Sequence, residues 1–318
     1  MNTSNIEPFK IQEDKISLHR IKFVILLTFQ IPAIIISLFI FVFFLKHRAL
    51  VYNQQNQALL LLLTVNFVAL SADLPMPIHF YYTNYVTPST AAYCTWWTYF
   101  EYSLNLISEL LMAVISIQRH IFVFQPRLLN IRLKRYVIYY FPLLFCLIYP
   151  PIFYLIIIVF YPCDGTQWVF SSNLCGYANC YLLYNKMLSS FAWVINNGLP
   201  SIIIFLANVV LVFRVVQQKR HRQQLITWKK QRRMALQLLA ISSVYMIGWI
   251  PNLISGVGQR IISPNFLAQI QLDYFLDLIY IVCLSLPWVC CRLLPEFNKW
   301  IWKLFCSGYV IRNDVGPT

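Results

Sequence analysis

Charged residues are scarce in this chain. They make up 11% of its 318 residues, whereas 59% of the residues are hydrophobic. A soluble domain of ordinary composition is about a quarter charged, so a globule of this length would lack the polar surface that solvation requires. The scarcity of charge excludes an ordinary soluble protein and indicates a polytopic membrane protein.

The chain also has few glycines and lacks recognisable catalytic and metal-binding motifs. The chain has only eight glycines, none in a loop that would cradle a phosphate. Its histidines and cysteines do not show metal-ligand spacing, and no nucleophile–base pair is recognisable. We therefore expect no enzymatic activity, no metal and no other cofactor.

Acidic residues are few, with 11 against 25 lysines and arginines, and the formal net charge is +14. The basic residues fall in short stretches between apolar runs, such as 221–233. This pattern is typical of loops that flank a membrane on its inner side. A nucleic-acid-binding surface is the weaker explanation, and we expect no nucleic-acid partner.

Long apolar runs are present in number, and each is near or above the ~20 residues that a spanning helix needs. The runs cover residues 22–45, 56–80, 94–124, 136–160, 187–216, 232–257 and 270–294. The predicted fold is an all-α membrane protein, a seven-transmembrane helix bundle.

The lysines and arginines are divided unevenly between the two sides of this bundle. One side carries six of the 25, namely Lys10, Lys15, Arg20, Lys22, Lys186 and Arg260. The positive-inside rule makes that side the outer one. We expect a multi-pass plasma-membrane protein with an outer tail without a signal peptide (1–21), a seven-span domain (22–294), an inner helix (295–306) and a cytoplasmic tail (307–318).

The inner helix is amphipathic. Its large apolar side chains recur at helical spacing, whereas Lys299 and Lys303 lie on the opposite side. We expect a short eighth helix along the inner leaflet, in contact with membrane lipid. Cys306 closes it, either as a palmitoylation site or as a free cytosolic thiol.

The outer side carries a sequon and four cysteines. Asn2-Thr3-Ser4 is a candidate N-glycosylation site at Asn2. Cys94, Cys163, Cys175 and Cys180 all fall on the oxidising side, where disulfides persist. Four cysteines allow three connectivities, and the residues alone leave these open.

The third run, which begins at Cys94, is unusual in carrying two carboxylates. Spacings of four, three and four residues place Glu101, Asn105, Ser108 and Met112 on one helical face. A carboxylate that faced lipid would cost a few kcal/mol. This face is therefore predicted to point into the bundle.

Over about 30–306 the chain resembles the rhodopsin-like (class A) family of G-protein-coupled receptors in six features. In chain order they are Asp73 in the second span, the interval of twenty-five residues from Cys94 to Arg119, Pro200 in the fifth span, Gly248-Trp249-Ile250-Pro251 in the sixth, Leu286-Pro287-Trp288-Val289-Cys290 in the seventh, and Phe297 ten residues beyond Pro287.

The resemblance implies a cell-surface receptor that binds an extracellular ligand and activates a heterotrimeric G protein, with arrestin as a further partner. Arg119, flanked by Gln118 and His120, would be the cytoplasmic contact. Trp249 and Pro251 would form the pivot of the sixth helix, and Pro287 would mark the corresponding motif of the seventh.

The resemblance also implies a disulfide from Cys94 to the second outer loop. The expected partner is Cys180, which leaves Cys163 and Cys175 to pair within the loop. Cys175 is the alternative partner of Cys94.

The ligand expected from the resemblance carries a cationic group. Glu101 lies at the depth where the family's amine receptors place an acid, Tyr280 matches the tyrosine that partners it, and Asp277 is one turn further out. With Asn105 and Trp249 these residues form a predicted anionic pocket. The alternative is a purely structural hydrogen bond between Glu101 and Tyr280.

The loop of about 161–186 is long, which favours a peptide ligand with a basic side chain. A small cationic amine is the alternative, although the stretch 192–196 lacks the serines that would bind a catechol. Retinal is excluded because the seventh span has no lysine for a Schiff base.

Two departures from the family pattern carry expectations of their own. Gln118 replaces the acidic residue that neighbours the arginine in the family. Because Arg119 then lacks a carboxylate to restrain it, we expect a less stable inactive state and measurable basal signalling. Asp73 and Ser108 match a sodium pocket, but Val282 and Leu286 supply no oxygen ligands there. This favours an aspartate that is held by hydrogen bonds.

Two other function classes remain as alternatives. A seven-helix transporter or channel would be expected to show paired repeats or rings of like charge, and neither is visible. A membrane-embedded enzyme could use the carboxylates of Asp73, Glu101 and Glu109 within the membrane, but these residues are not part of a recognisable catalytic motif.

Overall fold

The computed structural model describes residues 6–52, 54–124, 132–161, 167–176, 180–221, 225–263 and 265–310. Within these ranges, no side chain is described at 6–12, 14, 55, 122–124, 132, 183, 214–221, 225–238, 293, 295 and 305–310. The regular elements of the described residues are all helical. Seven segments are long and apolar enough to cross a membrane: Lys15–Lys46, Asn56–Thr83, Ala91–Ile121, Leu133–Val159, Lys186–Phe213, Leu239–Ile261 and Ala268–Arg292. The predicted seven-helix fold is confirmed.

Several crossings are built from more than one helical segment. In order they are α1 (Ile6–Lys46); α3 (Gln54–Val68), η2 (Ala69–Asp73) and α4 (Pro75–Thr83); α5 (Ala91–Phe124); η4 (Tyr136–Tyr140), α7 (Phe141–Tyr154) and η5 (Leu155–Val159); α9 (Lys186–Phe191), η8 (Ala192–Gly198) and α10 (Leu199–His221); α11 (Leu225–Ile261); and α12 (Ala268–Ile270), η9 (Gln271–Phe275) and α13 (Leu276–Leu293). The connecting and flanking helices are α2 (Arg48–Val51), α6 (Arg132–Arg135), η7 (Asn173–Gly176), α8 (Cys180–Tyr184) and α14 (Pro295–Val310).

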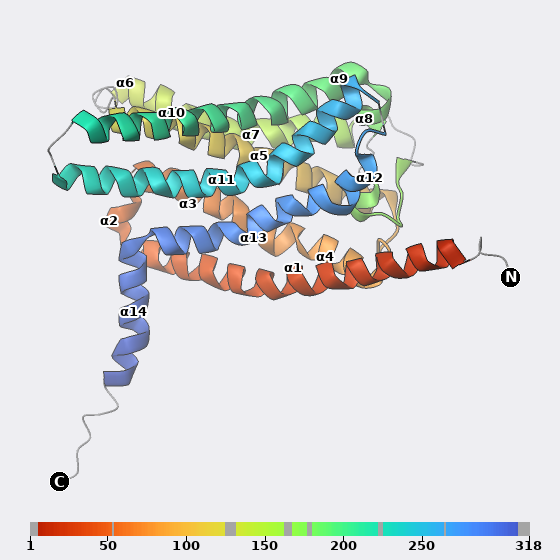
Figure 1. Ribbon diagram of the computed structural model, residues 1–318, viewed down its shortest axis with the longest axis horizontal. Helices are drawn as coiled ribbons and strands as arrows, with labels where there is room; N and C mark the ends of the chain where they lie inside the picture. Colours follow the sequence, from red (N-terminus) through yellow and green to blue (C-terminus); the bar gives the residue numbers. More distant parts are fainter. Residues whose placement is uncertain are drawn as a thin grey trace, which may run out of the picture.

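The crossings run side by side in one bundle, and α14 leaves it across their direction (Figure 1). α1 packs against both α4 and α13, which closes the ring of helices. α5 contacts α3, α7, α10 and α11. It is therefore the crossing around which the others are arranged, and a side chain on almost any of its faces meets another helix.

Wider, π-helical turns precede three of the prolines. The segments η2, η4 and η8 each contain the residue four positions before a proline, that is, before Pro75, Pro142 and Pro200. A proline has no N–H for the helical bond to that residue, and its ring clashes with that residue's carbonyl. The wider turn accommodates both effects without ending the crossing.

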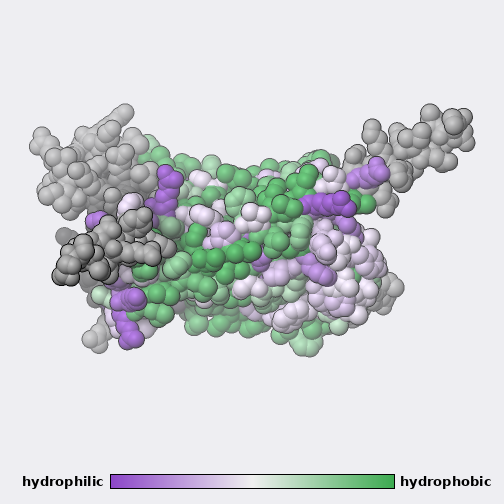
Figure 2. Space-filling model, turned by 90° about the horizontal axis from the view of Figure 1, so that it is seen from below, coloured by the Kyte–Doolittle hydropathy of each residue, from purple (hydrophilic) through white to green (hydrophobic). Residues whose placement is uncertain are grey.

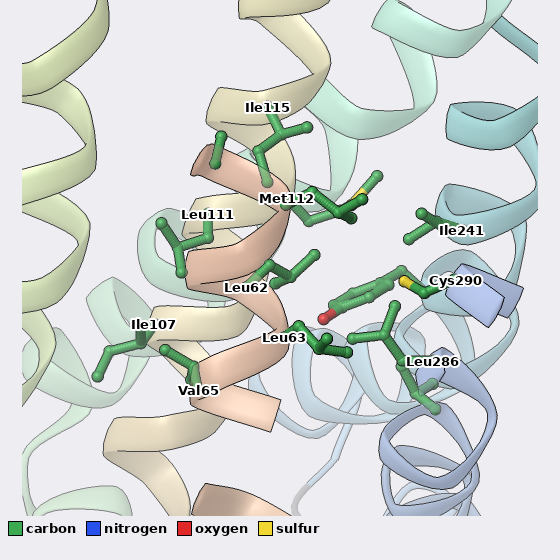
Figure 3. Packing of buried hydrophobic residues seen from close by; sticks show 14 of the residues in the cluster. Leu62, Leu63, Val65, Ile107, Leu111, Met112, Ile115, Ile241, Leu286 and Cys290 are labelled. Carbon is green, nitrogen blue, oxygen red and sulfur yellow. The ribbon is translucent and has the colours of Figure 1, made fainter. Parts of the chain in front are cut away.

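Apolar side chains fill the interior and also cover the outside. Leu62 and Leu63 of α3, Met112 of α5, Ile241 of α11 and Leu286 of α13 lie together in the core (Figure 3). On the surface a hydrophobic band covers the middle of the molecule, with hydrophilic residues toward its two ends (Figure 2). Such a surface suits lipid as the solvent, so the chain is a multi-pass membrane protein.

The first helix begins before the predicted apolar run. That run was placed at 22–45, but α1 begins at Ile6 and its membrane-spanning part at Lys15. Pro8 falls in the first turn of α1, where its missing N–H has no helical partner to lose. No further glycine or proline interrupts the chain before Pro32.

The eighth helix is present as α14, four residues longer than predicted. Phe297 is buried and its ring packs edge-on against that of Phe43 in α1, 5.4 Å between centroids. The ammonium of Lys46 lies 5.6 Å from the centre of the Trp300 ring. These contacts fix the start of α14 to the end of α1.

Gly248 allows α11 and α13 to approach each other. A Cβ atom at this position would overlap Val282 Cγ2 and lie 3.2 Å from the carbonyl oxygen of Leu278. We predict that Gly248→Val lowers the stability of the purified protein by about 1–3 kcal/mol through overpacking, measured as thermal unfolding in detergent. Val282→Ala in the same chain should restore much of the loss. An unchanged melting temperature in the single variant would contradict this packing.

Candidate functional site

A cavity of about 550 Å³ lies between α5, α7, the fifth crossing, α11 and α13. α5 contributes Glu101, Tyr102, Asn105 and Leu106 to its wall. The connection before the fifth crossing contributes Leu174, Tyr181 and Leu182.

Glu101 is the acidic residue of this wall, and its two carboxylate oxygens differ. Tyr280 donates a hydrogen bond of 2.9 Å to Oε1, which joins α5 to α13. Oε2 is buried and makes no hydrogen bond of full geometry among the described residues, although the Trp97 indole, one turn earlier on α5, lies close enough to interact with the carboxylate. The predicted Glu101–Tyr280 pair is confirmed. The second oxygen is left available for a donor or a cation that enters the cavity.

Of the other residues predicted for the ligand pocket, some line the cavity at Glu101 and one contacts a residue of its wall. Asn105 and Trp249 line the cavity together with Glu101, as the spacing on α5 and the position of Trp249 had suggested. Tyr280 reaches the site through its bond to Glu101 and is not part of the cavity wall.

Aromatic residues that the sequence did not single out form much of the remaining wall. They are Tyr102, Tyr154, Tyr181 and Trp193. The faces of such rings attract cations, and a carboxylate in the same cavity adds to this attraction. Trp193 lies seven residues before Pro200, two turns along one face, so helical spacing would have pointed to it; Tyr181 lies in a connection, where no spacing rule applies.

Asp277 is used elsewhere, which corrects its predicted place in the ligand pocket. Its Oδ2 lies 2.7 Å from Lys22 Nζ in an ion pair, and its Oδ1 accepts a 2.5 Å hydrogen bond from Tyr81. It does not line the cavity. Lys22 of α1 lies against the start of α13 and holds the Asp277 carboxylate there.

The disulfide of Cys94 also differs from the expected one. Cys94 pairs with Cys175, the alternative partner, and their Cα atoms are 5.8 Å apart. Cys175 is buried beside Trp97 and Tyr81 in the cluster at the amino-terminal end of α5. Cys180 instead begins α8 and is itself disulfide-bonded. The loop folds so that the nearer cysteine in space is not the one favoured by the family spacing.

The carboxyl-terminal end of α5 is held by hydrogen bonds between uncharged groups. The Gln118 amide donates to the carbonyl oxygens of Ile138, at 3.3 Å, and Tyr139, at 3.1 Å, in η4. His120 Nε2 bonds to the carbonyl oxygen of Ala207 in α10, at 2.7 Å. Between these two, Arg119 is buried. Gln118 and His120 thus connect α5 to its two neighbours at the level of the predicted cytoplasmic contact.

The polar residues at mid-depth do not form the expected arrangement. The Ser108 hydroxyl is hydrogen-bonded to Tyr245 of α11. Asp73 Oδ1 is buried without a hydrogen-bond partner among the described residues, so the hydrogen bonds predicted to hold this aspartate are not found. Glu109 Oε1 accepts a 2.6 Å bond from Ser201, which ties α5 to α10.

Pro251 and Pro287 lie inside α11 and α13, which continue through them. Asn2, Cys163 and the side chain of Cys306 lie outside the described residues. No group of three or more His, Cys, Asp or Glu side chains suited to a metal ion occurs in the part of the chain that the structure describes. No family model matches the chain, and neither does any curated protein.

The ion pair at the outer end is open to a direct test. Lys22→Met and Asp277→Asn should each destabilise the protein, whereas the double variant should lose less than the sum, with a coupling energy of about 0.5–3 kcal/mol. Thermal unfolding of the four proteins measures this energy. Strictly additive losses would show that the two side chains do not interact.

Proposed function

We propose that this chain is a cell-surface receptor of the rhodopsin-like type, which binds an extracellular ligand with a cationic group and activates a heterotrimeric G protein. The observation that carries the proposal is the buried Glu101 carboxylate in a cavity with an aromatic wall, where Tyr280 gives it its one hydrogen bond of full geometry among the described residues. A buried carboxylate without a cationic partner is costly, and a ligand ammonium or guanidinium would lower that cost.

The proposed ligand is a peptide that places one basic side chain beside Glu101. Glu101 shares the cavity wall with Leu174, Tyr181 and Leu182, so the rest of a peptide whose basic side chain meets Glu101 would pass along these three residues. A small cationic amine is the second candidate. It is favoured by the closeness of Tyr102, Tyr154, Tyr181 and Trp193 around one carboxylate.

The proposed orientation has the amino terminus outside the cell and the carboxyl terminus in the cytoplasm, at the plasma membrane. The Cys94–Cys175 disulfide supports it, because disulfides persist on the oxidising side. The disulfide lies at the start of α5, the end of the bundle toward the amino terminus, whereas α14 leaves the opposite end (Figure 1).

In the proposed mechanism Trp249 connects the ligand to the cytoplasmic side. It lines the cavity from α11, two residues before the proline in that helix. A ligand that contacts Trp249 differently in two arrangements of α11 would shift their populations. The G protein would then meet the inner ends of α5 and α11, with Arg119 as the contact.

Replacement of the proposed counter-ion is the test of the site. Once an agonist is found by screening basic peptides and amines with a promiscuous G-protein reporter, Glu101→Gln should weaken its binding roughly 30-fold or more, because one partner of a buried charge pair is lost. Radioligand binding on membranes measures the effect.

The matched control is Glu109→Gln, the same change on the same helix outside the cavity wall. Its amide oxygen can still accept the bond from Ser201, so agonist affinity should stay close to that of the wild type. If Glu101→Gln and Glu109→Gln had equal effects, the proposed counter-ion would be wrong.

The neutral inner end of α5 leads to a prediction about basal signalling. We expect the wild type to signal above mock-transfected cells, since Gln118 supplies no charge to restrain Arg119. Gln118→Glu, which introduces an acid beside Arg119, should lower this signal at equal surface expression. A wild-type signal indistinguishable from mock cells would contradict the expectation.

A further inference from the structure

Three consecutive residues of η7 adopt left-handed backbone conformations. The φ angles of Leu174, Cys175 and Gly176 are 52°, 54° and 92°. Glycine adopts such angles freely, but a residue with a Cβ atom is strained there. Strain of this kind persists only where the surrounding structure holds it, so Leu174 and Cys175 must be held by contacts with the rest of the molecule.

The two strained residues are held in different ways. The disulfide to Cys94 fixes Cys175. Leu174 is buried and lines the cavity at Glu101, and its backbone N–H donates to Asn173 Oδ1 at 2.9 Å. The position of Leu174 in the cavity wall therefore depends on what fixes the Asn173 side chain.

Tyr81 of α4 fixes the Asn173 side chain, and both residues are buried. Asn173 Oδ1 already accepts from the Leu174 N–H, a group that can only donate, so the amide nitrogen is the atom that faces Tyr81. Asn173 Nδ2 donates to the Tyr81 hydroxyl at 3.1 Å, and this hydroxyl donates to Asp277 Oδ1 at 2.5 Å. The two bonds form one directed chain from η7 through α4 to α13.

Lys22 of α1 completes this chain. Its ammonium lies 2.7 Å from Asp277 Oδ2 and 5.1 Å from the centre of the Tyr81 ring. A charged acceptor strengthens the hydrogen bond that the Tyr81 hydroxyl donates, and a hydroxyl that donates strongly is a better acceptor for Asn173. We call the four residues Lys22, Asp277, Tyr81 and Asn173 the Tyr81 clasp.

We propose that Tyr81 and Asn173 are positioning residues of the cavity at Glu101. Their hydrogen bond keeps Leu174 in the cavity wall, and its loss lets the strained segment relax and opens the wall to a ligand. Neither side chain lines the cavity, so both act through Leu174. This role rests on the proposed function only in that the cavity is taken as the ligand site. A weakened clasp should speed both the entry and the exit of a ligand.

The test measures access to the cavity through a cysteine placed at Asn105, a half-buried position of its wall. The purified full chain with Asn105→Cys, in nanodiscs, is treated with aminoethyl methanethiosulfonate, and mass spectrometry follows the labelling of residue 105. Adding Tyr81→Phe, which removes only the hydroxyl, should raise the labelling rate about fivefold through loss of a buried hydrogen bond. The matched control is Tyr82→Phe, the same change at the next residue, which is 69% exposed; it should leave the rate unchanged.

Asn173→Ala should accelerate labelling as much as Tyr81→Phe does, and the double variant should be no faster than either, because both changes remove the same bond. Hydrogen exchange of residues 167–176, measured without the introduced cysteine, should speed up in Tyr81→Phe and not in Tyr82→Phe. Cys146, a free cysteine buried in α7, reports general unfolding and should stay unlabelled in every variant.

Four results would each overturn the proposed role. They are unchanged labelling and exchange in Tyr81→Phe, equal acceleration in Tyr82→Phe, equal acceleration at Cys146, and a double variant whose rate is the product of the two single effects. The readouts need neither an agonist nor a G protein. Any of these results would leave the Glu101 counter-ion standing, and a failed Glu101→Gln test would leave the Tyr81 clasp standing.

Discussion

The hydrogen bond from Tyr280 to Glu101 joins α5 to α13 through two buried side chains. In hydrocarbon each polar group must find its partner inside the protein, and the same constraint fixes other contacts between crossings. Gln30 of α1 donates to the Leu70 carbonyl, Asn66 of α3 to that of Cys283, and Asn252 of α11 to that of Phe275. Side-chain amides that bond to neighbouring backbones therefore set the helix rotations, and the apolar core packs around them.

What distinguishes Glu101 from the other buried carboxylates is its place. Its Oε1 accepts the bond from Tyr280, and the side chain lies in the wall of a cavity. At the other end of α5, Gln118 and His120 bond to the backbones of two neighbouring crossings. In the proposed receptor, a ligand would complete the polar pairing at one end of α5, and the G protein would meet the other.

Helical spacing accounts for what could be predicted from the sequence. The seven crossings follow from their apolar length, and Glu101, Asn105 and Trp249 reach one cavity because 3.6-residue periodicity fixes the faces of α5 and α11. Spacing says nothing about contacts between elements whose relative placement depends on loops. The Cys94–Cys175 disulfide and the Lys22–Asp277 ion pair belong to this second kind. So does Tyr181, which enters the cavity wall from a connection.

Nucleotide exchange tests the central claim, that this seven-helix protein transmits a ligand signal to a G protein. The purified chain in nanodiscs would be mixed with purified heterotrimeric G proteins, and GDP release would be followed with and without a basic peptide or amine identified by screening. The account predicts faster GDP release than from empty nanodiscs, and a further increase with the ligand. Ligand binding without any acceleration of exchange from any G-protein subtype, together with ion or solute flux in liposomes, would contradict it.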